Sequence, residues 1–473
     1  MAIVILSVGL LVFFGHFLAD FFQRTKVPDV LILMLAGIAL GPVSGVVSPA
    51  DFGKVGPVFT TLALIIILFE GGIHLNVSHL GAAARDTLTI SLATFVVTVL
   101  LVTHIADLML PVEFPTAVLI GTVLGGTSSA VVVPLIRVLK MDPTPSTVLF
   151  LESALTDVLV IVLALGLLQG LEAQAAGGAG TLDAGRLLGD VGSSFLIAGL
   201  IGVAGAFVWS AILDRVREIP HTVFTTFAYV FILFGLAELW GYSGAIASLA
   251  FGIAVANFPN IPERLFGKIF SFRLTAFADH ERAFFAEAVF LVKTFFFVYL
   301  GVSMTFDNLA VVVAGLVLAV TVFVARAPVV RLLGSPNMSR RDAGLMTALV
   351  PKGLAAAVLA SLTVQAGIAD GELVQGTIYA AVFFSILLCA AFVFVLERGM
   401  LNRAAASLYG KFALEPSPVP TTGRRDSGLL IEPALIEFAS EALEPNPVDL
   451  EPRTDPASPE ERGRVGTSRG EGS

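Results

Sequence analysis

Long apolar runs constrain the fold of this chain more than any other feature of its sequence. Hydrophobic residues make up 56% of the 473 residues, charged residues only 14%, and the mean hydropathy is +0.90. The hydrocarbon core of a bilayer is about 30 Å thick, so a helix needs roughly 20 apolar residues to cross it. Because thirteen such runs follow one another along the chain, we expect an all-α polytopic membrane protein.

The thirteen expected spans are separated by polar residues, Pro or Gly. They cover residues 3–22, 27–43, 56–75, 86–109, 114–138, 145–170, 193–214, 221–239, 243–257, 286–305, 309–332, 343–366 and 374–398. No basic residue precedes the first run and no small-residue cleavage site follows it. We therefore expect it to stay in the protein as a membrane helix rather than to act as a cleaved signal peptide.

The basic residues between the spans are distributed unevenly. With an outer N-terminus, fourteen Lys and Arg residues fall in cytoplasmic loops and two, Lys54 and Arg186, fall in outer loops. The positive-inside rule therefore predicts a multi-pass protein of the cell membrane with its N-terminus outside and its C-terminus in the cytoplasm. Residues 403–473 are rich in Pro, Ser, Glu and Arg, a composition that predicts a disordered cytoplasmic tail.

Composition and motifs also exclude several classes of function. A net charge of −9 argues against a nucleic-acid partner, which would need clustered Lys and Arg. Cys389 is the single cysteine and His is rare, so we expect neither a disulfide framework nor a zinc site, and no cofactor. The sequence has no Gly-x-Gly-Asp pair and no His-Glu-x-x-His, the motifs of intramembrane proteases. We expect a transporter in the lipid bilayer rather than an enzyme.

The sixth expected span carries four polar residues around its middle. Asp157 and Ser153 share one face of this helix, and Glu152 and Thr156 share the adjacent face. A charged group at the bilayer centre costs about 2.5–3.5 kcal/mol even on the mildest scale, so such residues mark functional sites. A membrane scaffold whose polar residues only hold helices together is the alternative. Glu70 lies near the end of its span and is expected at an entrance rather than in the central site.

Two further spans are interrupted near their midpoints, the fifth at residues 125–129 and the twelfth at 351–353. Unwound backbone inside a membrane is tolerated where it is buried in protein or lines a cavity, and paired breaks are typical of transporters. Because spans five and twelve are seven apart, spans 1–6 and 8–13 run in opposite directions. This pattern predicts two inverted six-helix repeats with span seven as a connector. The alternative is that both breaks are ordinary kinks.

Three basic residues, Lys293, Arg326 and Lys352, lie well inside the expected spans and away from their ends. Arg326 and Glu152 have similar depths, and we expect a buried ion pair that holds helices together; the alternative is that Arg326 reaches the cytoplasmic interface. Lys352 either compensates the ends of the broken twelfth span or lies near Asp157. Lys293 is expected to reach an interface or face a water-filled crevice rather than to handle ions directly.

A central carboxylate flanked by hydroxyls and free carbonyls suggests how the chain works. These hard oxygen ligands suit a monovalent cation such as Na⁺ or K⁺, and the same carboxylate binds a proton instead. If the two exclude each other at Asp157 while the site faces one side at a time, the protein exchanges one for the other. A sodium-coupled organic-anion symporter is the alternative, since such carriers share inverted repeats and crossed broken helices. A channel would need a continuous filter of carbonyls or acidic rings, which the sequence does not indicate.

Six motifs distributed over residues 1–400 point to a known family. They are Leu-Phe-Glu-Gly-Gly at 68–72, Gly-Thr-Ser-Ser-Ala-Val-Val-Val at 126–133, Glu-Ser followed by Thr-Asp at 152–157, Phe-Phe-Val-Tyr-Leu-Gly at 296–301, Ala-Arg at 325–326 and Pro-Lys-Gly at 351–353. Together they resemble the monovalent cation/proton antiporter superfamily, nearest to its NhaP/NHE branch. Thr156 stands where that branch usually has Asn, Lys352 stands where Arg is commoner, and the Thr-Ser-Ser run resembles the Kef branch.

The resemblance implies an NhaA/NapA-like antiporter fold with two crossed broken helices, an elevator-like movement and a homodimer. Residues 1–402 would form the transmembrane domain. Its core helices would lie at about 86–170 and 309–398, and its dimerisation or scaffold helices at about 3–75 and 221–305.

The resemblance also implies roles for individual residues. Asp157 would carry Na⁺ or K⁺ and the proton, with Thr156 and Ser153 as its neighbours, Thr127 and Ser128 as broken-helix ligands, and Glu152 and Arg326 as a structural pair. Apart from the resemblance, the sequence offers Lys352, Ser129 and Lys293 as candidate modulators of this site. Electrogenic relatives carry a second carboxylate where this chain has Thr156. The resemblance therefore implies electroneutral exchange, with a role in pH homeostasis.

Overall fold

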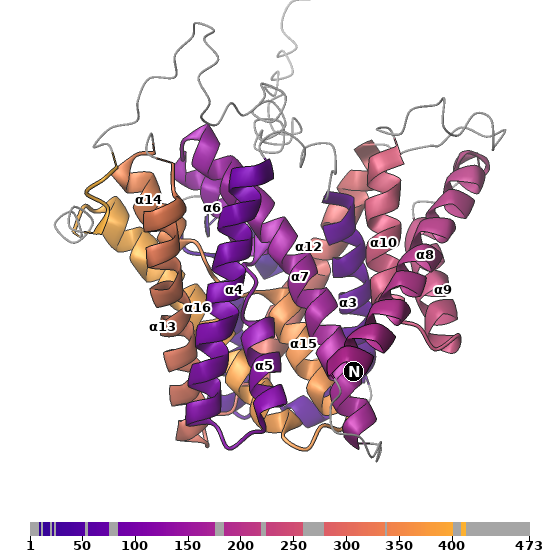
Figure 1. Ribbon diagram of the computed structural model, residues 1–473, viewed down its shortest axis with the longest axis horizontal. Coiled ribbons are helices and arrows are strands. Elements are labelled where there is room, and N and C mark those ends of the chain that lie inside the picture. The colour runs from indigo at the N-terminus through magenta and orange to yellow at the C-terminus, as the bar shows by residue number, and fades with distance from the viewer. Residues whose placement is uncertain are drawn as a thin grey trace, which may run out of the picture.

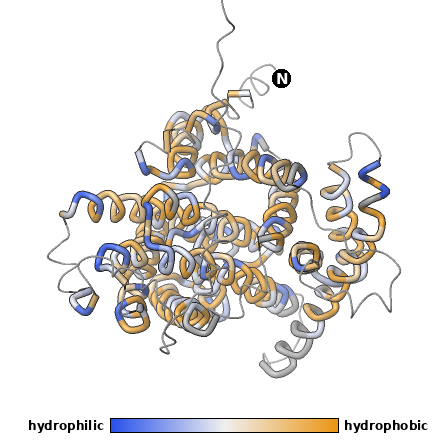
Figure 2. The backbone as a smooth tube through the Cα atoms, turned by 90° about the horizontal axis from the view of Figure 1, so that it is seen from above, coloured by the Kyte–Doolittle hydropathy of each residue, from blue (hydrophilic) through white to orange (hydrophobic). Residues whose placement is uncertain are grey.

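The computed structural model describes residues 9–10, 13–18, 21–22, 25–52, 55–74, 84–175, 184–218, 224–258, 279–335, 338–400 and 408–412. Its long elements are all helices, and six of them contain stretches long and apolar enough to cross a membrane, by length and composition. These six are α4 (Ala84–Met109), α7 (Pro143–Ala175), α8 (Ala184–Arg217), α12 (Asp279–Val302), α13 (Leu309–Leu333) and α16 (Gly371–Glu397). Figure 2 shows that hydrophobic residues line most of the helical backbone.

Shorter helices complete the described part of the chain. They are α2 (Asp29–Ile38), followed by a π-helical turn at Ala39–Val43 and a 3₁₀ turn at Pro49–Phe52, then α3 (Val55–His74), α5 (Phe114–Val123), α6 (Ser129–Leu139), α9 (Thr225–Leu239), α10 (Gly244–Asn257), α14 (Arg340–Ala348) and α15 (Leu354–Gln365). Much of the first expected span, 3–22, lies outside the described residues.

The helices pack in two groups, which Figure 1 shows side by side. In the first group, α13 packs against α4 and α16, α4 packs against α5, and α15 packs against α16. In the second group, α2 packs against α12, while α10 packs against both α3 and α8. Contacts of α3 with α7 and α15 join the two groups. The polar middle of α7 therefore lies close to where they meet.

Pairs of glycines bring helices of the second group into backbone contact. A Cβ atom at Gly37 of α2 would lie 2.9 Å from the Cα of Gly301 on α12, too close for a side chain. Gly72 of α3 and Gly252 of α10 face each other in the same way. Lipid tails give helices no hydrophobic reason to associate, so small residues that allow close approach supply the packing contacts.

Both interrupted spans fold as pairs of separate helices. The fifth is divided into α5 and α6, which leaves residues 124–128 outside regular helix. The twelfth is divided into α14 and α15, which leaves residues 349–353. Gly and Pro at these places favour helix ends, and each observed break lies within two residues of the expected one.

The expected disorder from residue 403 onward is wrong for residues 408–412. Tyr409 and Phe412 are 4% and 2% exposed. Arg331 of α13 donates to the carbonyl of Leu408 at 2.9 Å, and Arg340 of α14 donates to that of Phe412 at 2.9 Å. Two aromatic side chains in an otherwise polar stretch supply enough apolar surface to dock it. The rest of the tail, at 403–407 and 413–473, lies outside the described residues.

Candidate functional site

The breaks of the two helix pairs contact each other in the interior, at a place that we refer to as the crossing. The backbone N–H of Ser128 donates to the carbonyl of Pro351 at 2.9 Å, and the backbone N–H of Lys352 donates to Oγ of Ser385 on α16 at 2.9 Å. Gly353 lies so close to the Ser128 side chain that a Cβ there would collide with it. Backbone groups that lose their helical partners thus bond to each other, as the absence of water at this depth requires.

Lys352 links one broken helix to the other through its side chain. It is 2% exposed, and its Nζ donates to the carbonyl of Gly126 at 2.6 Å. Gly126 follows the C-terminal end of α5, where unpaired carbonyls give the helix end a partial negative charge. The ammonium group therefore compensates a helix end, and it also acts electrostatically on Asp157.

Asp157 lies half-buried on α7 and faces the start of α6. The hydroxyl of Ser129, the first residue of α6, donates to Asp157 Oδ2 at 2.9 Å. The resemblance assigned the ligand positions to Thr127 and Ser128, and Ser129 was expected only as a modulator. The structure instead brings Ser129 into contact with the carboxylate.

The other hydroxyls of this region bond to backbone. Thr156 Oγ1 donates to the carbonyl of Glu152 at 2.9 Å and accepts the backbone N–H of Thr127 at 3.1 Å. Ser153 is fully buried, and its hydroxyl donates to the carbonyl of Phe150 at 2.9 Å. Thr156 thus fastens α7 to the broken fifth span beside Asp157.

Glu70 of α3, expected from the sequence at an entrance and not in the central site, has an electrostatic influence on that site. It is half-buried, and its charge acts electrostatically on Asp157 from the second group of helices. An acidic residue followed by two glycines within an apolar run is the signal that marks it. Gly72 explains part of this signal, because it allows α3 to pack closely on α10.

Arg326 and Glu152 form a buried, two-pronged ion pair between α13 and α7. Nη2 of Arg326 lies 2.6 Å from Oε2 of Glu152, Nη1 bonds to Oε1, and both residues are 0% exposed. The alternative in which Arg326 reaches the interface is therefore wrong. Paired N–H groups match the two carboxylate oxygens in geometry as well as in charge.

Two further acceptors complete the surroundings of Arg326. Nη1 also donates to Thr94 Oγ1 of α4 at 2.7 Å, and Nε donates to the carbonyl of Met346 in α14 at 3.1 Å. One guanidinium group thereby joins four helices of the first group. Thr94 was missed by the sequence analysis, although Ser91, Thr94 and Thr98 form a polar stripe at helical spacing in α4.

Lys293 lies apart from these residues. Its Nζ pairs with Asp29 Oδ2 at 3.0 Å and so joins α12 to α2 in the second group. It is not an unpaired charge, because the acidic residue at the start of α2 neutralises it. This pair holds α12 against α2, and a modulating role of Lys293 at Asp157 stays a prediction.

The arrangement around Asp157 offers oxygen ligands of one kind. The Asp157 carboxylate and the Ser129 hydroxyl are hard ligands that suit alkali cations and protons. In the part of the chain that the structure describes, no three His, Cys, Asp or Glu side chains gather as a transition-metal site would require.

The sequence of this chain is similar to those of several known proteins. A family model described as "Sodium/hydrogen exchanger, transmembrane" matches residues 9–396. The Na(+)/H(+) antiporter 1 of Methanocaldococcus jannaschii is 25% identical over 452 residues, which cover 85% of this chain and 95% of that protein. The K(+)/H(+) antiporter NhaP2 of Shewanella sp. MR-4 is 23% identical over 429 residues, which cover 87% of this chain and 67% of that protein.

A solved structure shows the same fold. The sodium proton antiporter MjNhaP1 from Methanocaldococcus jannaschii, determined at pH 8, superposes with a TM-score of 0.65. The match covers 82% of this chain and 99% of that chain at 21% identity. The arrangement of helices described above is therefore one that a known transporter adopts.

Proposed function

The chain belongs to the sodium/hydrogen exchanger family, in its NhaP-like branch, and from that membership we propose that it exchanges a monovalent cation, Na⁺ or K⁺, for H⁺. Its relatives are named as Na⁺/H⁺ and K⁺/H⁺ antiporters, which are transporters rather than enzymes. The substrates of this chain are then small cations and protons, and its surroundings are a lipid bilayer.

The exchange takes place at Asp157. The ionised carboxylate binds the cation, with the Ser129 hydroxyl and carbonyls of the crossing as further oxygen ligands. The protonated carboxylic acid binds no cation, so each ion excludes the other. The site opens to only one side at a time, so a proton that enters from one side displaces a cation to that same side. After the proton has been released on the opposite side, the site binds a cation there and carries it back.

One carboxylate carries the charge in either direction, which makes the exchange one-for-one and electroneutral. Thr156, the residue next to Asp157, bonds to the Thr127 N–H and the Glu152 carbonyl, and it carries no charge to add to the count. Glu70 is an acidic neighbour from the other helix group, and in this proposal it attracts cations to Asp157.

The architecture of the proposal follows from the helix pairs. Counting α5 with α6 and α14 with α15 as two broken spans, the chain crosses the membrane thirteen times as two inverted repeats. The N-terminus lies outside and the C-terminal tail in the cytoplasm. The first helix group is the moving core, with the ion-carrying break inside it, and the second is the scaffold and homodimer contact.

The single observation that carries the proposal is the hydrogen bond from Ser129 to Asp157 at the crossing of two broken helices. It places the one hydroxyl at the start of α6 against the central carboxylate of α7. Broken helices meeting at a charged residue are the typical construction of an ion site in secondary transporters.

The test uses the full chain in proteoliposomes with a preformed proton gradient. Addition of Na⁺ or K⁺, each separately and over a range of pH, should collapse the gradient in the native protein. Asp157→Asn keeps the size of the side chain but removes its titratable charge, and it should abolish the response. Lys293→Gln, which changes a pair within the scaffold, serves as the matched control and should keep it.

Two results would contradict the proposal. A gradient that no alkali cation collapses at any pH would direct attention to sodium-coupled uptake of an organic anion. A collapse that persists in Asp157→Asn would place the exchange at another residue.

A further inference from the structure

A cavity of about 310 Å³ opens on the flank of the first helix group, between α13, α14, α16 and residues 408–409. We refer to it as the flank cavity; Phe323, Ala327, Thr347, Phe392, Leu396 and Tyr409 are among its lining residues. Figure 1 shows α13, α14 and α16 on the side of the molecule away from α8 and α9. The flank cavity is therefore separate from both the ion site and the second helix group.

The lining of the flank cavity offers few hydrogen-bonding groups to a polar ligand. Its two hydroxyl groups, those of Thr347 and Tyr409, lie 2.5 Å apart and bond to each other. The Thr347 hydroxyl also bonds to the Ala343 carbonyl at 3.0 Å. Because these polar groups already have partners, the cavity suits a hydrocarbon ligand. Cavities of this size, about 300–1,000 Å³, are typical of small-molecule sites.

The flank cavity faces the region that lipid occupies. Two of its walls, α13 and α16, are candidate membrane spans. Val324 lines it and is 61% exposed, so the opening lies on a side that would otherwise touch lipid tails. A hydrocarbon chain is the material that surrounds this opening in a membrane.

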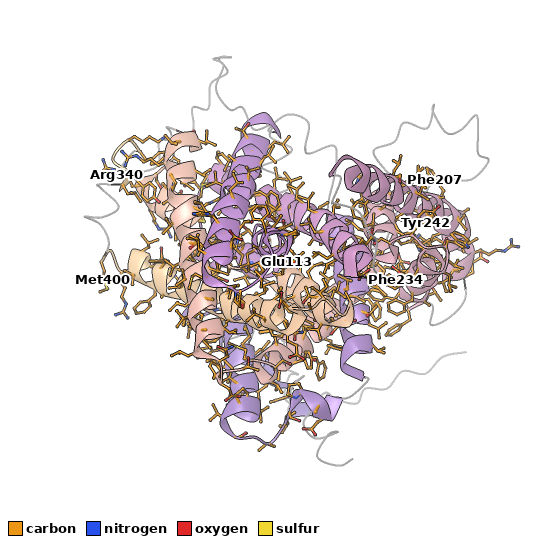
Figure 3. All side chains as sticks on the ribbon, turned by 60° about the horizontal axis from the view of Figure 1, so that its bottom comes forward. Glu113, Phe207, Phe234, Tyr242, Arg340 and Met400 are labelled. Carbon is orange, nitrogen blue, oxygen red and sulfur yellow. The ribbon has the colours of Figure 1, made fainter. Side chains whose placement is uncertain are left out.

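Cationic side chains gather at one end of the flank cavity. Arg331 lies one helical turn beyond the lining residue Ala327 on α13 and donates to the carbonyl of Leu408, another lining residue. Lys411 lies 3.5 Å from the carbonyls of Leu332 and Gly334 at the end of α13. Figure 3 shows Arg340, which holds the docked segment, on the same flank as Met400.

These cations bond to carbonyl oxygens instead of to acids. Within the described ranges, Arg331, Arg340 and Lys411 have no ion pair with a carboxylate. Arg331 and Lys411 are exposed. An apolar cavity that ends at uncompensated positive charge is complementary to a molecule with a hydrocarbon chain and an anionic head.

We propose that the flank cavity binds one acyl chain of an anionic phospholipid, with the phosphate held by Arg331 and Lys411. The acyl chain of the lipid lies against Thr347 and Ala348 of α14, the first half of the broken twelfth span. The lipid therefore supports the helix that leads into the crossing. Residues 408–412 form the part of the site that covers the acyl chain near the head group.

The test measures lipid binding and does not depend on ion exchange. Full-length protein is purified in detergent, mixed with phosphatidylglycerol or phosphatidylcholine, and examined by native mass spectrometry and by thermal unfolding. We expect one tightly held phosphatidylglycerol, with stabilisation that phosphatidylcholine does not give. Arg331→Gln with Lys411→Gln keeps hydrogen-bond donors but removes two charges, and it should weaken binding roughly thirtyfold.

Two further variants separate the charge from the shape of the site. Ala327→Phe fills the cavity and should remove the bound lipid, while Arg331→Lys keeps the charge and should retain it. The matched controls are Arg398→Gln, a cation stacked on Phe394, and Val313→Phe, an exposed position of α13 outside the cavity. Both should bind lipid as the native protein does.

Equal binding of phosphatidylcholine and phosphatidylglycerol would overturn the proposal. So would retention of the lipid by Ala327→Phe, provided that the variant is folded by its cooperative thermal transition. Loss of the lipid in both controls as well would show a general effect of altered surface and would also overturn it.

Discussion

The Arg326 guanidinium meets the Glu152 carboxylate in a two-pronged contact that is closed off from solvent, with Nη2 and Oε2 2.6 Å apart. Removing one partner of such a pair leaves the other as an uncompensated buried charge. We therefore expect Glu152→Gln to lower the free energy of unfolding by about 3–5 kcal/mol. Thermal unfolding in detergent measures this loss.

A surface pair provides the control for this prediction. Glu397 pairs with Arg341 and with Lys26, each at 2.7 Å, but the two basic side chains are 45% and 39% exposed. Exposed pairs contribute about 0–1 kcal/mol, so Glu397→Gln should change stability little. If Glu152→Gln unfolds at the same temperature as the native chain, the pair does not hold the four helices together.

The buried pair also shows what sequence reasoning reaches and where it stops. The matching depths of Arg326 and Glu152 were readable, because a 1.5 Å rise per residue fixes depth along a membrane helix. The rotation of each helix about its axis was not readable, since it depends on packing against neighbours. For this reason Thr94, which accepts from Arg326 at 2.7 Å, was missed.

The site around Asp157 likewise has features that can be predicted from the sequence and features that cannot. Asp157 and the two breaks were predicted because charged or unwound segments are costly in lipid and stand out from apolar surroundings. Whether Thr127, Ser128 or Ser129 faces the carboxylate depends on where α6 begins, and helix ends are the least certain feature of a sequence. The family resemblance is confirmed by the match over residues 9–396.

Lys352 gives a prediction about the crossing. In the native chain the Gly126 carbonyl lies 2.6 Å from Nζ of Lys352. Lys352→Met removes the ammonium group and leaves this carbonyl without its partner. A buried group left unsatisfied costs about 1–3 kcal/mol, and the end of α5 loses its compensating charge. We expect lower thermal stability and at least a roughly tenfold fall in exchange rate.

Lys293→Met is the matched control for Lys352→Met. It breaks a pair with Asp29 in the second helix group, so it should lower stability while leaving the cation dependence of exchange unchanged. Native exchange rates in Lys352→Met would show that the crossing does not need the charge.

Glu70 gives a prediction about cation affinity. Its negative charge acts on Asp157 from α3, and a negative charge near a cation site favours cation binding. Glu70→Gln should raise the cation concentration for half-maximal exchange roughly tenfold while exchange at saturating cation persists. Glu238→Gln, at the end of α9, should leave this concentration unchanged. An unchanged concentration in Glu70→Gln would remove Glu70 from the ion site.

Asp342, at the start of α14, gives a prediction about pH. Burial and the neighbouring Asp142 carboxyl raise the pKa of Asp342 to about 6, while Arg341 Nη1 lies 3.7 Å away and its Nε and Nη2 bond to Glu397. A carboxyl with a raised folded-state pKa makes folding less favourable as pH rises from about 4 to about 6. Asp342→Asn should therefore be more stable than the native chain at pH 7, by about 1–3 kcal/mol, and equal to it below pH 4.

Asp51 is the control for Asp342, because its pKa is shifted in the opposite direction. The backbone N–H and hydroxyl of Ser48 lower the pKa of Asp51, so its contribution to stability is present at neutral pH and lost in acid. Melting temperatures of Asp51→Asn and Asp342→Asn, recorded from pH 4 to 8, should differ from the native curve in opposite directions at neutral pH. A pH-independent difference for Asp342→Asn would contradict the assignment.

The central claim is that a proton and a cation compete for Asp157, and proton release on cation binding tests it most directly. Purified protein in weak buffer is mixed with Na⁺ or K⁺, and the protons set free are counted with a pH-sensitive dye. We predict release of up to one proton for each cation bound, rising as the starting pH falls into the range where Asp157 is protonated, and none in Asp157→Asn. Cation binding without proton release at every pH, or release that persists in Asp157→Asn, would contradict the claim.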